Sequence, residues 1–177
     1  IANKIVDLQK NDTAFEKEFA KWHKSESEKA TSWKTIRPTS MQSNRAKLEV
    51  MEDGSIYSSG DVTKRDIFDL NFTSDQPITA LRIEALTDDR LPGYGPGRCY
   101  YEGRKGTFFL SEVEVKTANG IKVPLSKPIA SGGNGAEKVI DQDGSSGWSS
   151  AIGQANHLIL PLTKPLPANQ PLSMSLL

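Results

Sequence analysis

Apolar side chains near the start of the chain recur at helical spacing. Phe15, Phe19 and Trp22 stand at i, i+4 and i+7, which places them on one face, and Lys and Glu fill most positions between them. We predict a helical segment over residues 1–32 whose apolar stripe packs on the following domain. A free-standing helix that binds a partner through the same stripe is the alternative interpretation.

Beyond residue 32 the helical period ends, and short apolar runs alternate with turn residues such as Asn119-Gly120, which is typical of a hairpin. Many short strands at this spacing predict an all-β domain over residues 33–177, an antiparallel β-sandwich of the jelly-roll type. The predicted strands are Trp33–Arg37, Ala46–Met51, Ser55–Ser58, Asp66–Phe72, Ile78–Leu86, Thr107–Val115, Ile121–Val123 and His157–Leu162.

The segment Pro161–Leu177 is rich in proline and then becomes apolar. Leu172, Met174 and Leu176 alternate with serine, as at the start of a strand that stops abruptly. We expect this strand to continue into a partner strand in a longer protein. If that partner strand is missing, the sandwich has an open edge or another chain fills it.

A long loop between the predicted strands Ile78–Leu86 and Thr107–Val115 is rich in glycine, proline, tyrosine and charge. A pyranose ring can stack on tyrosine faces, while planar charged groups bind its hydroxyls. The alternative is a structural loop in which the aspartates pair with the arginines and the tyrosines pack on neighbouring strands. The candidate ligand-binding residues are Asp89, Tyr94, Arg98, Tyr100 and Tyr101.

Composition narrows the function classes. The chain has 22 basic and 22 acidic residues, for a net charge of +0, which argues against a nucleic-acid-binding protein. No apolar run reaches the length of a membrane-spanning helix, so we expect no membrane insertion. The single cysteine excludes an internal disulfide and the paired cysteines of a c-type haem attachment. No nucleophile elbow, phosphate loop or dinucleotide fingerprint is present, and we expect a non-catalytic protein.

Two segments resemble halves of a discoidin-like domain, also called galactose-binding-like or coagulation-factor C-type. Leu125–Leu162 resembles the opening half of that domain through Asp141, Asp143, Ser146 and Trp148, with Gln142 and Ser146 where the family usually has Gly and Thr. Ile78–Val115 resembles the closing half through Ala80-Leu81-Arg82-Ile83 and Ser111-Glu112-Val113-Glu114-Val115. The closing half comes first, so the chain resembles a circularly permuted member of this family.

This resemblance implies a structural calcium ion. Carboxylate and carbonyl oxygens in an irregular loop are suitable Ca²⁺ ligands. The ligands implied by the family are Asp141, Asp143, Ser146 and Glu112. The alternative is an ordinary Asx-turn loop whose side chains bond to their own backbone.

The motif Leu86–Arg98, LTDDRLPGYGPGR, is similar to a region in large multidomain secreted proteins of planctomycetes. Those proteins carry a cytochrome-like haem segment; this chain lacks the attachment motif, so no haem is expected in it. The resemblance implies an extracytoplasmic location, periplasmic or secreted. Because the chain opens with Ile1, we expect a processed product or a fragment.

Together these observations predict a non-catalytic, carbohydrate-binding accessory module of a larger protein. Its expected partners are a glycan or polysaccharide and the other domains or subunits of that protein. The alternative is a structural or protein-interaction module that docks domains or subunits of a haem-containing assembly.

Overall fold

The structure is a computed structural model that describes residues 13–29, 31–63, 65–98, 106–151 and 153–177. The chain divides into two compact units between Lys34 and Thr35. The second unit is built mainly of antiparallel strands, as the alternating sequence pattern predicts.

The first unit contains helix α2, Thr13–Lys29. Its aromatic side chains form a row: the ring centroids of Phe15 and Phe19 are 6.3 Å apart, and those of Phe19 and Trp22 are 5.7 Å apart. The predicted helix is therefore confirmed over these residues, and its apolar stripe is exposed, at 48%, 52% and 57% for the three side chains. Within the described residues, no helix has both the length and the apolar character needed to cross a membrane.

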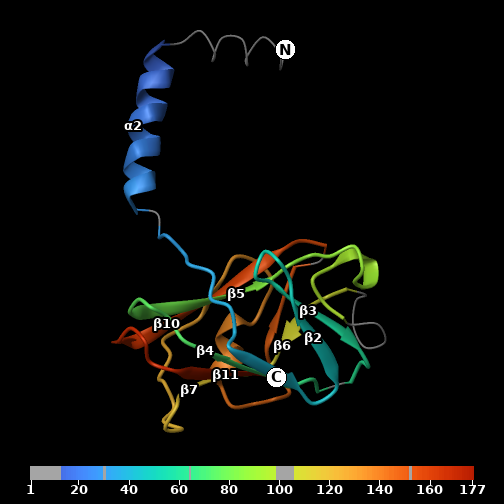
Figure 1. Cartoon of the computed structure of the whole chain (residues 1–177). Coiled ribbons are helices and arrows are strands. Elements are labelled where there is room, and N and C mark those ends of the chain that lie inside the picture. Colours follow the sequence, from blue (N-terminus) through green and yellow to red (C-terminus); the bar gives the residue numbers. More distant parts are fainter. Residues whose placement is uncertain (1–12, 30, 64, 99–105, 152) are drawn as a thin grey trace. The chain divides into compact units, whose positions relative to one another are not determined.

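The second unit is organised around two larger antiparallel sheets (Figure 1). The first has four strands in the order β1-β4-β11-β7, and the second has three in the order β5-β10-β8. Their bounds are β1 Ser40–Ser43, β4 Phe68–Phe72, β11 Leu172–Leu176, β7 Val113–Thr117, β5 Ile78–Ala85, β10 Asn156–Leu166 and β8 Ile129–Ala130.

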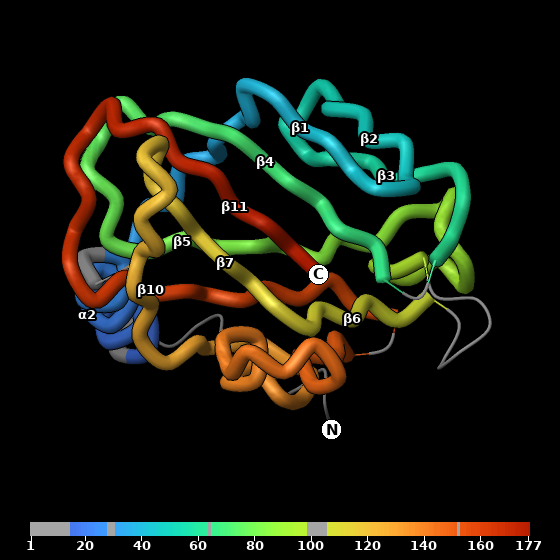
Figure 2. The backbone as a smooth tube through the Cα atoms, turned by 90° about the horizontal axis from the view of Figure 1, so that it is seen from below, coloured from blue at the N-terminus to red at the C-terminus, as the bar shows by residue number. Residues whose placement is uncertain are grey.

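Smaller elements complete the second unit. Strands β2 (Ala46–Val50) and β3 (Ile56–Gly60) form a hairpin, and β6 (Phe109–Leu110) pairs with β9 (Trp148–Ser149). Two 3-10 turns, η1 (Pro92–Tyr94) and η2 (Ala136–Ile140), lie in the loops. Figure 2 shows β4, β11 and β7 side by side, and β5 beside β10.

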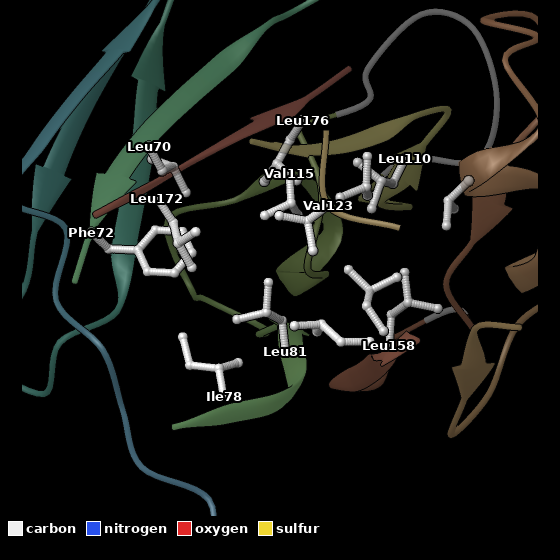
Figure 3. Close-up of a cluster of buried hydrophobic side chains, with 14 of the residues drawn as sticks. Leu70, Phe72, Ile78, Leu81, Leu110, Val115, Val123, Leu158, Leu172 and Leu176 are labelled. Carbon is white, nitrogen blue, oxygen red and sulfur yellow. The ribbon is translucent and has the colours of Figure 1, made fainter. Parts of the chain in front are cut away.

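The core is formed by side chains from the inner faces of both larger sheets. Along β10, Leu158 and Leu160 are fully buried and alternate with half-buried residues, which is the period of a strand with one face on a core. Figure 3 shows Phe72, Leu172 and Val115 of the first sheet pointing toward Leu81 and Leu158 of the second. Burying one such leucine stabilises the fold by roughly 2 kcal/mol relative to leaving it exposed.

The C-terminal strand differs from its prediction. Leu172–Leu176 is strand β11, and it pairs with β4 on one side and β7 on the other, so it has no open edge. The prediction of a missing partner strand was wrong. An alternating apolar run reports a buried face, but it carries no information about which strands lie on its two edges.

Several predicted strand bounds also need correction. Trp33–Arg37 is not a strand, and Ile121–Val123 contributes only an isolated bridge between Lys122 and Lys116. The predicted strand Thr107–Val115 is two strands, β6 and β7, because the amides of Ser111 and Glu112 donate to the Leu177 carbonyl instead of continuing one ladder. Strands β1, β8 and β9 were not predicted.

Candidate functional site

The described ends of the loop that joins β5 to β6 make close backbone contacts with each other. The Gly97 amide donates to the Gly106 carbonyl at 3.0 Å. A side chain at Gly97 would clash with the backbone, because a Cβ there would lie 2.0 Å from the Thr107 carbonyl oxygen. Glycine at position 97 therefore lets two backbone segments touch, and the loop ahead of Arg98 is held in one conformation.

Arg98 binds the β3–β4 connection through its guanidinium group. Its Nη1 donates to Ser58 Oγ at 3.1 Å and to Asp66 Oδ2 at 3.0 Å. Its Nη2 donates to the Gly60 carbonyl at 2.8 Å and also to the Asp61 carbonyl. The side chain is 13% exposed. These bonds engage Arg98 within the protein, as in the structural interpretation of this loop, although the partners differ from those expected.

Asp88 and Arg90 form a second fixed pair. Arg90 Nε and Nη2 donate to the two carboxylate oxygens of Asp88 at 2.8 and 2.7 Å, and the Arg90 amide donates to Asp88 Oδ1 at 2.8 Å. The hydrogen bonds from Arg90 lower the pKa of Asp88 to about 2. The guanidinium carbon also lies 3.8 Å from the centroid of the Tyr57 ring, a cation–π contact that joins the loop to β3.

Tyr94 ends η1, and its side chain is 70% exposed. Its φ of +55° lies in the left-handed region, which is uncommon for a residue with a large side chain. Asp89, in the loop that follows β5, is also exposed. Two members of the predicted ligand-binding set, Tyr100 and Tyr101, lie outside the described residues, as does Cys99.

The predicted calcium loop is a pair of consecutive Asx turns. Asp141 Oδ1 accepts from the Asp143 amide at 2.8 Å, and its Oδ2 accepts from Ser146 Oγ at 2.7 Å. Asp143 Oδ1 accepts from the amide of Ser145 at 2.9 Å and from its hydroxyl at 2.6 Å. These bonds lower the pKa of both aspartates. The arrangement is the one that the Asx-turn interpretation expects.

Gln142, between the two aspartates, has a φ of +67°. Glycine adopts this left-handed backbone without a steric cost, so the residue type that the resembling family uses here suits the geometry. Gln142 therefore holds a backbone conformation that glycine adopts more readily.

Glu112 lies between β6 and β7, and its carboxyl group meets that of Asp141. Burial raises the pKa of Glu112, and the hydrogen bond with the Asp141 carboxylate raises it further. Its Oε1 atom is buried and has no hydrogen-bond partner within the described part of the chain. An orphaned carboxylate oxygen beside a second carboxylate fits a cation, since a cation would satisfy both groups.

The other predicted ligands fit a cation less closely. Asp143 and Ser146 face their own loop through the hydrogen bonds given above. No cluster of three or more His, Cys, Asp or Glu side chains arranged to hold a metal occurs in the residues that the structure describes. Of the four predicted ligands, the structure thus brings the carboxyl groups of Glu112 and Asp141 together.

The Asp88–Arg90 pair is one that the structural interpretation of this loop expects. The partners of Arg98 and the contact of Arg90 with Tyr57 were missed by reasoning from sequence. Ser58 and Asp66 are 40 and 32 residues from Arg98 along the chain. Tyr57 lies in β3, and nothing in the sequence of that strand indicates a contact with Arg90. The Asx turns, by contrast, join residues two to five positions apart and are visible in the spacing of the aspartates and serines.

Comparison of the chain with protein-family models, with curated proteins and with solved structures finds no match.

Proposed function

We propose that the second unit is a β-sandwich of the galactose-binding-like type and that it acts as a non-catalytic glycan-binding module of a larger, extracytoplasmic protein. The fold assignment is supported by a single core that takes side chains from both larger sheets, such as Leu172 from one and Leu160 from the other. A core shared by two sheets is what the proposed sandwich requires of its two layers.

The exposure of Tyr94 is the observation that carries the glycan proposal. Its side chain is 70% exposed on a loop whose backbone is anchored on both sides, by the Asp88–Arg90 pair before it and by Arg98 after it. A ring held out on a rigid support binds with little loss of conformational freedom. The face of Tyr94 would stack on a pyranose, and the exposed carboxylate of Asp89 would accept its hydroxyl hydrogen bonds.

Arg98 has a supporting part in this proposal. All of its described contacts are to groups of the protein, so it positions the loop and leaves the sugar to Tyr94 and Asp89. Because the contact surface is one ring and one carboxylate, we expect weak, millimolar affinity.

We further propose a structural calcium ion at Glu112 and Asp141, with Asp143 and Ser146 in the same loop. The orphaned Oε1 atom of Glu112 supports the proposal. The ion would tie the loop that follows η2 to the start of β7 and would take no part in a reaction.

The glycan proposal is tested by titrating the ¹⁵N-labelled chain with neutral and amino sugars at millimolar concentration and following amide shifts by NMR. We expect shifts at residues 88–97, lost in Tyr94→Ala and kept in Tyr94→Trp. Ile121→Ala is the matched control, because Ile121 is similarly exposed, at 66%, in a different turn. Absence of shifts with every sugar, in a chain that gives a folded spectrum, would overturn the proposal.

A second candidate, a protein-interaction module within a haem-containing assembly, is favoured by the aromatic row of α2. About half of each of the Phe15, Phe19 and Trp22 side chains is exposed, and an apolar helix face of this kind fits a groove in a partner. If the neighbouring domains of the parent protein bind α2, their addition would shift Trp22 fluorescence to shorter wavelength. The shift would be absent in Phe19→Ser and retained in Glu18→Gln.

A further inference from the structure

Strand β5 forms an edge of its sheet. In the order β5-β10-β8, no described strand lies beyond β5. Its residues make no backbone–backbone hydrogen bond outside the ladder with β10 in the described part of the chain. With 8 residues, Ile78–Ala85 is a long edge, whereas the edge strand β1 has 4 and β8 has 2. The edge beside β7 is partly covered, because the Val123 amide donates to the Val115 carbonyl.

The sequence of β5, ITALRIEA, has few of the features that keep edge strands from pairing with other chains. It has no proline, no lysine and no glycine, and its bulge lies on the β10 side, between Pro161 and Leu166. Its only charges are Arg82 and Glu84, which point to the outer face and form an ion pair at 2.8 Å. These two charges decide which strand can pair with this edge.

A second copy of the chain can meet this edge about a two-fold axis perpendicular to the sheet. Such an axis keeps the core side of both copies on the same side of the joined sheet, so outward residues of one copy face outward residues of the other. A register centred on Arg82 places two arginines opposite each other, and one centred on Glu84 places two glutamates opposite each other. Both arrangements are destabilising.

The register centred on Ile83 has the opposite property. It places Arg82 of each copy opposite Glu84 of the other, so two cross-strand ion pairs form on the outer face. On the core face it places Ile83 opposite Ile83 and Leu81 opposite Ala85, which are apolar pairs. A register centred on Leu81 leaves each arginine opposite Ala80 and has no such pairing. The edge is therefore self-complementary in one register.

We propose that two copies of this chain associate through antiparallel pairing of their β5 edges, centred on Ile83, to form one continuous sheet across the dimer. The pairing extends over about five strand residues from each copy, which predicts a weak or moderate dimer. This inference is independent of the glycan proposal, because Tyr94 and Asp89 lie outside β5.

The test is the molecular mass of the full chain in solution, measured by sedimentation and by light scattering over a range of concentrations. We expect a dimer in wild type. Arg82→Glu places glutamates opposite glutamates at two symmetric positions, and we expect the dissociation constant to rise about tenfold. The double variant Arg82→Glu/Glu84→Arg restores opposite charges across the edge and should restore the dimer. Lys116→Glu is the control, since Lys116 pairs with Glu114 on the other sheet.

Amide hydrogen exchange gives a second readout. The β5 amides that point away from β10, toward the free edge, should exchange more slowly as the concentration of the chain rises. This protection should be absent in Arg82→Glu. Circular dichroism melting shows that each variant is folded before its mass is interpreted. A monomer in wild type at every concentration, or a dimer that neither the single reversal nor the double reversal changes, would overturn the proposal.

Discussion

Arg98 and Asp66 form an ion pair at 3.0 Å, yet the pKa of Asp66 is raised because the cost of burying its carboxylate exceeds the attraction of the guanidinium. The Asp66 Oδ1 atom is buried with no hydrogen-bond partner among the described residues. The pair holds the glycine-rich loop onto the β3–β4 connection, but ionisation of Asp66 adds little to the stability of the fold. The two residues should therefore respond unequally to mutation.

We predict that Arg98→Ala lowers the free energy of unfolding by about 3 kcal/mol, because it leaves a buried carboxylate and two carbonyls without their donor. Asp66→Asn should cost clearly less, since the amide has no charge to bury. Chemical denaturation of both variants measures the difference, and Arg45→Ala, at an exposed position, controls for loss of a surface arginine. Equal costs for Arg98→Ala and Asp66→Asn would contradict the unequal roles inferred for the pair.

Two glycines allow steric clash to be separated from backbone strain. At Gly97 a Cβ would lie 2.0 Å from a carbonyl oxygen, whereas at Gly120, with a φ of +77°, nothing lies within 4 Å. We predict that Gly97→Ala destabilises the fold by about 3 kcal/mol and Gly120→Ala by about 1 kcal/mol. Thermal unfolding of the two variants measures the ranking. A greater destabilisation by Gly120→Ala than by Gly97→Ala would mean that residue 97 moves away from residues 106 and 107 and relieves the clash.

Strands and contacts could be predicted from the sequence where the residues that define them lie close together along the chain. Period-two alternation located β2, β4, β5 and β10 to within a few residues, because each runs for at least five residues with one side less exposed than the other. Two residues cannot show a period, so β8 and β9 could not be found this way. Nor could alternation place β11 between two other strands.

The same limit applies to the candidate sites. The turns formed by Asp141 and Asp143 follow from local spacing, and they were among the interpretations that the sequence left open. The Arg98 contacts span 32 to 40 residues, and nothing in the loop motif identifies Asp66 or Ser58 as partners. The orphaned oxygen of Glu112 is also a product of packing, because it depends on how β7 meets the loop after η2.

The Asp88–Arg90 pair predicts an acid-side pH dependence. The pKa of Asp88 is lowered to about 2 from its ordinary 3.8, so its contribution to stability is fully present above pH 3.8 and is lost as the pH falls toward 2. Arg90→Gln should raise the pKa of Asp88 toward its ordinary value and weaken this dependence. NMR titration of the carboxyl carbons measures both. Asp143 is the internal control, because its pKa is lowered mainly by hydrogen bonds from Ser145 and should not change.

Glu112 predicts a pH dependence of the opposite sign in the absence of metal. Its pKa is raised above the ordinary 4.5, so its contribution to stability is fully present below that value and is lost as the pH rises through the folded-state pKa. Glu112→Gln should therefore be as stable as wild type near about pH 4 and more stable at about pH 7 in EDTA. Calorimetric unfolding across this range checks the crossover.

Calcium should make wild type more stable than Glu112→Gln at neutral pH, the reverse of the order expected in EDTA. An ion that binds only the folded chain raises its melting temperature by mass action, and the Glu112 and Asp141 carboxylates would be its charged ligands. We expect wild type to melt higher in millimolar CaCl₂ than in EDTA, with a smaller effect near about pH 4, where Glu112 is protonated. Glu112→Gln should lose most of this response. Asp53→Asn should keep it, because Asp53 accepts from Ser55 in an Asx turn like that of Asp143 but in the β2–β3 hairpin. Equal melting temperatures of wild type in CaCl₂ and in EDTA would overturn the calcium proposal and leave Glu112 as a carboxyl group that packs against the loop without a metal.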